Sequence, residues 1–213
     1  MDDSEEQEIC FCSAVELSRR SRSGEISAME ILEIFFDRIR RINPTLNAIV
    51  SIDEEQAYAT ARKLDTIPLG SRGLLHGIPI AVKDLVATRG LRTTMGSLIY
   101  QKYYPDTDEL FVSRLKTAGA VIFGKTNTPE FGAGSQTFNE VFGPTVNPYD
   151  LKKTCGGSSG GAAAALAARL LPLADGSDLG GSLRNPASFC NVVGFRPSPG
   201  RVPFWPKKPI DDG

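Results

Sequence analysis

The stretch Thr154-Cys155-Gly156-Gly157-Ser158-Ser159-Gly160-Gly161 runs directly into the alanine-rich segment 162–168. Alanine has the highest helix propensity, so we expect a helix over 162–170 that follows a glycine-rich turn. Seven of the 21 glycines of the chain lie between Gly156 and Gly181. Glycines gather where the backbone turns sharply or approaches a ligand closely, so we expect the chemistry of the protein in this region.

Two chemical interpretations of this turn compete. A glycine-rich turn before a helix can bind a phosphate through free N–H groups, which would make the chain a non-catalytic anion-binding module. The Walker form of such a loop needs a Gly-Lys-Ser/Thr sequence, and this stretch lacks it. Residues 156–160 also match the Gly-x-Ser-x-Gly nucleophile elbow, whose Asp and His partners follow the serine in the chain. The single histidine, His76, precedes it, so the elbow interpretation lacks a base within this sequence.

Helical and strand-like segments alternate on both sides of the turn. Ser13 with Glu16 and Ser27 with Glu30 form capping-box patterns, which predict two helix starts. After the second, apolar residues recur at helical spacing as far as Pro44, which is expected to stop the helix. Further helices are expected over 53–64 and 109–118, and strands over 46–52, 78–82, 120–123, 171–174 and 192–195. This alternation predicts an α/β protein with a largely buried sheet.

A second serine, Ser182, lies 24 residues beyond Ser158 and directly follows two glycines. The consecutive N–H groups of Leu179, Gly180, Gly181 and Ser182 are candidates for an oxyanion hole, since glycines let a carbonyl come close. Upstream, Lys83 follows the apolar run 78–82, where burial would lower the pKa of its amine and allow it to act as a base. A lysine after a strand more often points to water, and a serine in a turn more often bonds to the backbone. Taken singly, these residues do not decide between a catalytic and a purely structural role.

Together, the same residues resemble the amidase signature family, the Ser-Ser-Lys hydrolases of amides. The match runs almost unbroken from Gly77 to Val202. It includes Gly124-Lys-Thr-Asn127, Glu130-Phe131, Phe142-Gly-Pro144, Asn147-Pro148, Gly156-Gly-Ser-Ser-Gly-Gly161, Asp178-Leu-Gly-Gly-Ser182, Arg184, Pro186-Ala187 and Gly194-Phe-Arg-Pro197. The resemblance implies the fold of that family, a mixed and mostly buried central sheet flanked by helices on both faces.

Carried over residue by residue, the resemblance implies that Ser182 is the nucleophile, that Ser158 relays its proton and that Lys83 receives it. The resemblance also implies a cis peptide bond before Ser158. It further implies that the N–H groups of residues 179–182 bind the oxyanion. Ser159, Asp178 and Arg184 match family positions, and we expect them to orient the loop around the triad. This chemistry is coherent without a cofactor or a metal, because a neutral amine can activate a hydroxyl.

Other residues near the motifs carry weaker expectations. Asp84, beside Lys83, either supports the local polar network or bonds to the backbone at the end of a strand. Cys155 and Cys190 border the motifs, but a cysteine nucleophile would need a histidine base that the nearby sequence lacks. His76 is expected to fill a structural place or to lie at the edge of a pocket, and no cluster of residues suggests a metal site.

The charge balance restricts the partners. The chain has 213 residues, with 24 Lys+Arg, 25 Asp+Glu and a net charge of -1. Nucleic acid and anionic membranes both attract basic surfaces, so neither is expected as the main partner. The longest apolar run is too short to span a bilayer, and the acidic N-terminus differs from a secretory signal. We expect a cytoplasmic protein that acts on a small molecule.

Length is where the sequence departs from the resemblance, because 213 residues are about half of a family member. We expect residues 1–70 to form an N-terminal helical region and residues 71–213 to form the N-terminal part of an incomplete family core. The C-terminal half of the same protein is then the expected partner, and a homodimer is compatible with this interpretation.

The favoured function is hydrolysis of a carboxylic amide, or of a related aryl amide or carbamate (a urethane), through an acyl-enzyme on Ser182. One alternative is an amidotransferase subunit that releases ammonia from glutamine in a tRNA-dependent complex. The alternative of another class is the non-catalytic anion-binding module described above.

Overall fold

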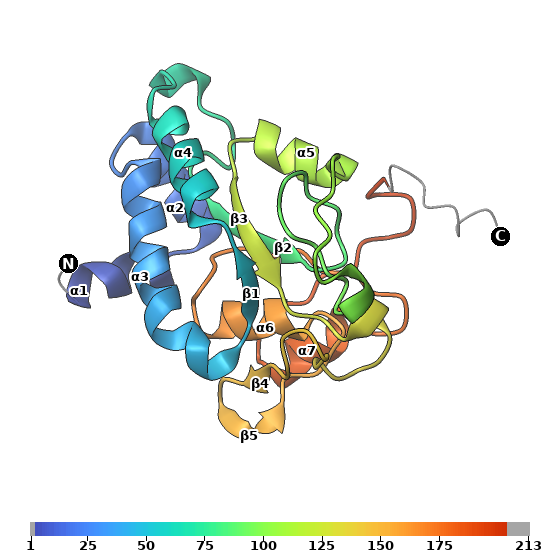
Figure 1. Ribbon diagram of the computed structural model, residues 1–213. Helices are drawn as coiled ribbons and strands as arrows, with labels where there is room; N and C mark the ends of the chain where they lie inside the picture. Colours follow the sequence, from blue (N-terminus) through green and yellow to red (C-terminus); the bar gives the residue numbers. More distant parts are fainter. Residues whose placement is uncertain (1–2, 204–213) are drawn as a thin grey trace.

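A three-stranded mixed sheet forms the centre of the computed structural model, which describes residues 3–203 (Figure 1). The strands lie in the order β1 (Ile49–Ile52), β3 (Val121–Thr126) and β2 (Pro79–Lys83). β2 and β3 are parallel, whereas β1 is antiparallel to β3. Every residue of β2 and β3 is buried, as expected of parallel strands covered on both faces. The largely buried sheet predicted from the sequence is therefore present, and it is mixed, as the resemblance implies.

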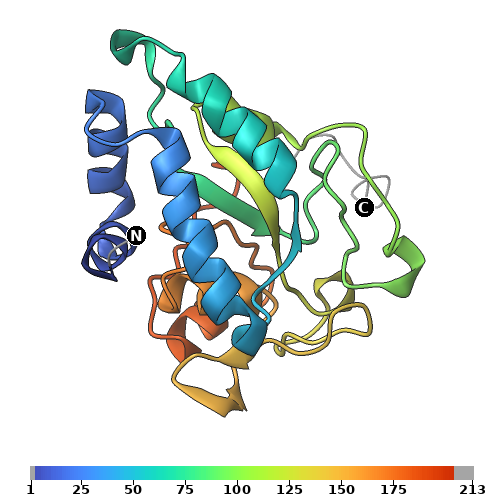
Figure 2. The same ribbon diagram turned by 60° about the vertical axis from the view of Figure 1, so that its left-hand side comes forward.

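Seven helices surround this sheet in the described part of the chain, and Figure 2 shows α3 and α4 running alongside it. They are α1 (Asp3–Phe11), α2 (Ala14–Ser23), α3 (Ala28–Leu46), α4 (Glu54–Asp65), α5 (Leu110–Thr117), α6 (Gly160–Ala167) and α7 (Arg184–Phe189). Three short 3-10 turns, η1 (Leu69–Ser71), η2 (Leu98–Tyr100) and η3 (Glu130–Gly132), and a small hairpin of β4 (Val146–Asn147) and β5 (Asp150–Thr154) complete the described elements.

Two apolar clusters cover the two faces of the sheet. Ala81 and Phe123 belong to a cluster with residues of α3, α4 and α6, whereas Ile80, Val82 and Ile122 belong to a cluster with residues of α2, α3 and α5. Because consecutive strand residues point to opposite faces, the two clusters lie on opposite sides of the sheet. Helices therefore flank both faces, as the resemblance implies.

Helix α3 is the longest helix and is fixed at its start by the predicted capping box. The Ser27 hydroxyl accepts from the Glu30 N–H, and the Glu30 carboxylate accepts from the Ser27 N–H. The helix does not stop at Pro44, as the sequence led us to expect, but continues to Leu46, so that β1 begins only at Ile49. Burial of Leu46 favours this last turn, and the side chain of Asn43 binds the backbone that follows it.

The strands predicted over 171–174 and 192–195 are absent from the structure. Both segments follow helices that end in a residue with left-handed backbone, Arg169 (φ 59°) after α6 and Asn191 (φ 52°) after α7. The next N–H groups bond back into those helices, Leu170 to the Ala165 carbonyl and Val192 to the Ala187 carbonyl. These N–H groups close helix ends instead of pairing with a strand, because a left-handed residue terminates a helix in this way. The predicted aperiodic stretch 201–213 lies outside the described residues from position 204 onward.

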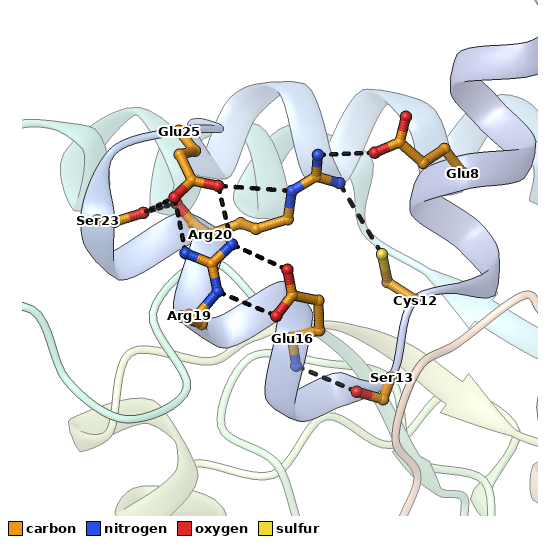
Figure 3. A network of polar contacts seen from close by, with 8 residues as sticks. All are labelled: Glu8, Cys12, Ser13, Glu16, Arg19, Arg20, Ser23 and Glu25. Carbon is orange, nitrogen blue, oxygen red and sulfur yellow. Dashed lines mark hydrogen bonds and ion pairs between the residues drawn. The ribbon is translucent and has the colours of Figure 1, made fainter.

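An exposed network of ion pairs joins α1 to α2 (Figure 3). The guanidinium of Arg20 reaches Glu8 at 2.7 Å and also pairs with Glu25, while Arg19 pairs with both Glu16 and Glu25. Exposed ion pairs contribute little to stability, because water and salt screen them. The buried side chains of the second apolar cluster, Leu17 of α2 among them, therefore do more than this network to hold the N-terminal helices on the core.

The single histidine is structural. His76 is fully buried, and neither ring nitrogen has a hydrogen-bond partner among the described residues. Burial disfavours the imidazolium, and the charge of Arg72 acts in the same direction, so the pKa of His76 lies below its ordinary value of 6.5.

The buried histidine predicts a loss of stability in acid. Below pH 6.5 the unfolded chain binds a proton at His76 that the folded protein does not bind, so the free energy of unfolding falls until the pH reaches the lowered folded-state pKa. A His76→Phe variant keeps a ring but cannot titrate. Urea unfolding between pH 5 and 8 should show less acid destabilisation in this variant, and equal pH dependence in both proteins would contradict the interpretation.

Candidate active site

Lys83, the last residue of β2, places a fully buried amine against three hydroxyls. Its Nζ lies 2.7 Å from Ser158 Oγ, 3.0 Å from Ser159 Oγ and 3.0 Å from Ser177 Oγ. The backbone N–H of Lys83 also donates to Asp175 Oδ1 at 2.8 Å, which ties the end of the strand to the segment that leads to Ser177. The lysine therefore does not point to water, as most lysines after strands do.

Burial lowers the pKa of Lys83 to about 8, because a charged amine is poorly solvated in this position. The negative charges of Asp175 and Asp178 oppose the shift. A pKa near 8 leaves a useful fraction of the amine neutral at physiological pH, and a neutral amine can accept a proton from a hydroxyl. The site thus holds an amine whose chemistry is that of a base and does not depend on a histidine.

The glycine-rich turn packs tightly against its neighbours. A Cβ on Gly160 would lie 2.2 Å from Thr137 Oγ1, and one on Gly161 would lie 2.3 Å from the Asn127 nitrogen. The peptide bond between Gly157 and Ser158 is cis, as the resemblance implies. Glycine is needed here so that two pieces of backbone can touch, with Ser158 held beside Lys83.

The N–H groups at the start of α6 are not free for a phosphate. Those of Ser159, Gly160 and Gly161 donate to Ser182 O, Thr137 Oγ1 and Asn127 O, at 3.1, 3.2 and 3.2 Å. An anion site at a helix start depends on unpaired N–H groups. The anion-binding interpretation of this turn therefore has no support in the geometry.

Ser182 lies on an open loop next to this pocket. Its carbonyl accepts from the Ser159 N–H at 3.1 Å, which joins the loop to the serine turn. Within the described residues, Ser182 Oγ makes no hydrogen bond to Ser158 Oγ. The structure thus brings Lys83, Ser158 and Ser159 into direct contact, and it brings Ser182 beside them through the backbone.

One of the four expected oxyanion donors has another partner. The Gly181 N–H donates to Asp178 Oδ1 at 2.7 Å, so it is not available in the way the resemblance implied. Leu179 is 98% exposed and Gly180 is exposed, so this end of the loop faces open space. The N–H groups of Leu179, Gly180 and Ser182 remain the candidates for binding an oxyanion.

Asp178 holds the loop in shape. Its carboxylate accepts from the N–H groups of Gly181 and Leu183 and from the guanidinium of Arg184, at 2.7, 3.1 and 2.9 Å. The hydrogen bonds from Arg184 keep the pKa of this carboxyl far below its usual value. Since Asp178 bonds to residues on both sides of Ser182, it fixes the turn that presents the serine.

Sequence reasoning missed three residues of this pocket. Ser177 and Asp175 touch Lys83 directly, and their position between the two serine motifs is the only signal that could have indicated them. Burial raises the pKa of Asp175 to about 6. A second fully buried lysine, Lys125 on β3, donates to the Val86 carbonyl and to Thr88 Oγ1 and so holds the segment that follows Lys83.

The remaining candidates have structural surroundings. Asp84 is buried and accepts from the N–H and the hydroxyl of Thr94, which matches the backbone-binding alternative. Burial raises the pKa of Cys155 to about 12 and that of Cys190 to about 11, so neither thiol forms a nucleophilic thiolate near neutral pH. In residues 3–203 no group of three or more His, Cys, Asp or Glu side chains could hold a metal, and no helix is long and apolar enough to cross a membrane.

Comparisons with known proteins identify the family of the chain. The family model described as Amidase matches residues 30–212. A curated relative from Carboxydothermus hydrogenoformans, one of the subunits of glutamyl-tRNA(Gln) amidotransferase, is 46% identical over 92% of this chain and 41% of its own length.

Two solved structures extend the likeness. A bacterial aryl acylamidase of the amidase signature family superposes with a TM-score of 0.87 at 36% identity, over 91% of this chain and 41% of its own. A 6-aminohexanoate cyclic dimer hydrolase, solved with its substrate, superposes with a TM-score of 0.78 at 38% identity, over 85% of this chain and 37% of its own. The chain spans about two fifths of the length of the curated relative named above.

Close packing of the turn predicts that Gly161→Ala is destabilising. The new Cβ would lie 2.3 Å from the Asn127 nitrogen and 2.7 Å from the Ala48 carbonyl oxygen, and backbone atoms cannot move aside cheaply. We expect a loss of about 1–3 kcal/mol in the free energy of unfolding, measured in urea. Gly70→Ala is the matched control, because its Cβ would meet nothing within 4 Å. Equal stability of the two variants would show that the turn is loosely packed.

Proposed function

The chain belongs to the amidase family, and from this premise we propose that it carries the catalytic part of an amidohydrolase that cleaves a carboxylic amide through an acyl-enzyme on Ser182. The observation that carries the proposal is the buried Lys83 amine, hydrogen-bonded at 2.7 Å to Ser158 with its pKa lowered to about 8. A base of this kind, next to a serine pair, has the chemistry that amide cleavage requires.

Acylation proceeds by two linked proton transfers. Neutral Lys83 takes the proton of Ser158, Ser158 takes the proton of Ser182, and Ser182 Oγ attacks the amide carbon. The carbonyl electrons move to oxygen, where the N–H groups of Leu179, Gly180 and Ser182 stabilise the negative charge. The step requires the Ser182 hydroxyl to turn toward Ser158, and catalytic hydrogen bonds often tighten only when a substrate is bound.

Collapse of the tetrahedral intermediate breaks the C–N bond. The proton held by Lys83 returns through Ser158 to the leaving nitrogen, which departs as a neutral amine or as ammonia. A water molecule then attacks the ester on Ser182, and its proton passes to Lys83 by the same route. Release of the carboxylic acid restores the hydroxyl and the neutral lysine, so protons and charge balance over the cycle.

The neighbouring residues support this relay as positioning residues. Ser159 and Ser177 hold the other faces of the Lys83 amine, and Asp178 with Arg184 holds the loop that carries Ser182. We propose a small-molecule amide as the substrate, with aryl amides and carbamates as related classes, because all share one acyl centre. We also propose that the protein is cytoplasmic and that a boundary near residue 70 separates an N-terminal helical region from the family core. We propose the C-terminal half of the same protein as its partner, and a homodimer is compatible with this arrangement.

A second candidate is favoured by one specific observation. Curated relatives at 46% to 49% identity are subunits of glutamyl-tRNA(Gln) amidotransferases. In that case the same triad would release ammonia from glutamine within a larger complex. The test offers the complete protein four substrates: an aliphatic amide, an aryl amide, a carbamate and glutamine. If only glutamine is hydrolysed, this candidate is favoured over the free amidohydrolase.

Covalent labelling tests the nucleophile. A fluorophosphonate should label the complete protein, and Ser182→Ala should abolish both the label and amide hydrolysis. Lys83→Ala should reduce both by a factor on the order of 10³ or more, since the serine then lacks its base. Ser113→Ala, on helix α5, is the control with normal labelling. Full amide hydrolysis by Ser182→Ala or Lys83→Ala would refute the triad.

The pH profile tests the base. Lys83 acts only when neutral, so kcat/KM should rise with pH, pass its midpoint near the Lys83 pKa of about 8 and level off at higher pH. The charge of Asp175 raises the pKa of Lys83, so Asp175→Asn should move this midpoint to lower pH. The measurement is kcat/KM between pH 5 and 10 for one amide. A midpoint that stays in place or moves to higher pH in the variant would contradict the assignment of Lys83.

A further inference from the structure

The hydroxyl of Thr137 bridges the two ends of the serine turn. Thr137 is buried, and its Oγ1 donates to the Gly156 carbonyl at 2.8 Å and accepts from the Gly160 N–H at 3.2 Å. A hydroxyl carries one donor proton and two acceptor lone pairs, so one side chain can make both bonds. Gly156 and Gly160 lie two residues before and two residues after Ser158. A single oxygen therefore closes the piece of backbone that carries the relay serine.

Thr137 is anchored outside the turn. Its carbonyl accepts from the N–H of Thr145 at 2.9 Å. The hydroxyl of Thr145 in turn donates to the carbonyl of Asn47, which caps the end of α3, at 2.6 Å. The same hydroxyl accepts from the side-chain amide of Asn127, which follows β3, at 2.9 Å. The position of Thr137 is thus set by elements that do not belong to the turn.

The two groups that Thr137 binds have no good alternative partner. Gly156 and Gly160 are both buried. The only other donor to the Gly156 carbonyl within the described residues is the thiol of Cys155, at 3.5 Å, and a thiol is a weak donor. In residues 3–203 the Gly160 N–H has no acceptor besides the Thr137 hydroxyl. A buried N–H without an acceptor is unfavourable, so the turn would have to shift if this hydroxyl were removed.

A shift of the turn would disturb both serines of the relay. Ser158 Oγ lies 2.7 Å from Lys83 Nζ, within direct hydrogen-bond reach. The N–H of Ser159 donates to the Ser182 carbonyl at 3.1 Å, so the turn is also tied to the loop of the nucleophile. Proton transfer depends on these separations, and a misplacement of about 1 Å can lower a rate by a factor of about 100. Closure of the turn therefore bears on the relay as well as on stability.

We infer that Thr137 is a positioning residue that sets the spacing of the proton relay by closing the serine turn through its hydroxyl. It bonds to the backbone of the turn and acts through Ser158. Both hydrogen bonds need the hydroxyl and neither needs the methyl group, so serine can replace threonine here and valine cannot. The inference rests on the proposed amide hydrolysis, since it treats Ser158 as the relay.

The test removes the hydroxyl and keeps the shape of the side chain. Kinetics are measured with the complete protein and one amide that it hydrolyses. Thr137→Val should lower kcat about 10-fold to 100-fold and change KM less than about twofold, because the relay is displaced while the groups that bind substrate stay in place. Thr137→Ser should keep kcat within about threefold of the wild type.

Thr93→Val is the matched control. The Thr93 hydroxyl is also buried and donates to a backbone carbonyl, that of Leu91, at 3.0 Å, but it bonds to no residue of the turn. This variant should keep the kcat of the wild type, and urea unfolding of all variants separates loss of fold from loss of spacing. If Thr137→Val does not fold, Thr137→Cys replaces it, and its kcat should lie below that of Thr137→Ser. Unchanged kcat in Thr137→Val, an equal loss in Thr93→Val, or no recovery in Thr137→Ser would overturn the inference.

Fluorophosphonate labelling separates this inference from the proposed function. The second-order labelling rate of Ser182 reports how well the serine is activated, without any amide cleavage. If the wild type takes the label but hydrolyses no amide, the amidohydrolase proposal fails, and a labelling rate at least about 10-fold lower in Thr137→Val would still support the inference. An unchanged labelling rate in this variant would overturn it even if amides are hydrolysed. A wild type that neither takes the label nor hydrolyses an amide would refute both.

Discussion

Burial lowers the pKa of an amine, because the charged form loses its solvation by water, and the site around Lys83 depends on this effect. The Nζ of this lysine has three hydroxyl partners, Ser158, Ser159 and Ser177, all within 3.0 Å. An ammonium can donate to all three, whereas a neutral amine can donate to two and accept from the third. The same three oxygens therefore satisfy both protonation states, so a proton can arrive and leave without leaving a buried polar atom unpaired. Strand, turn and loop all converge on this nitrogen.

Holding Ser158 beside that amine depends on close backbone contact. The turn 156–161 lies against Asn127 and against residues 135–137. At Gly157, Gly160 and Gly161 the distances leave no room for a Cβ. The start of α6 gives its N–H groups to protein oxygens and not to a ligand. A glycine-rich turn before a helix is commonly an anion site, and here the same composition serves packing. Composition alone does not distinguish the two, because both need backbone without side chains.

The fold and the site were predictable from the sequence to different degrees. Ser27 with Glu30 marked the start of α3, and the apolar run 78–82 marked β2, because caps and apolar runs are local signals. The end of α3 was misplaced since burial of Leu46 outweighs the effect of Pro44. The segments 171–174 and 192–195 are apolar like strands, but each lies after a left-handed residue at a helix end, where the N–H groups of Leu170 and Val192 bond back into the preceding helix. Local pattern does not reveal which partner an N–H group will find.

For this protein, the sequence by itself determined the motifs and the resemblance to the amidase family, and that resemblance implied a lysine as the base. The motifs consist of residue types at fixed spacings, which need no knowledge of distance. Only the tertiary structure decided that Ser177 and Asp175 touch Lys83, that Asp178 accepts from the Gly181 N–H, and that the backbone at Gly132 lies close to Ser158. Most of these contacts join residues that lie far apart in the chain. The folded arrangement sets them, because burial and close packing act across space and not along the sequence.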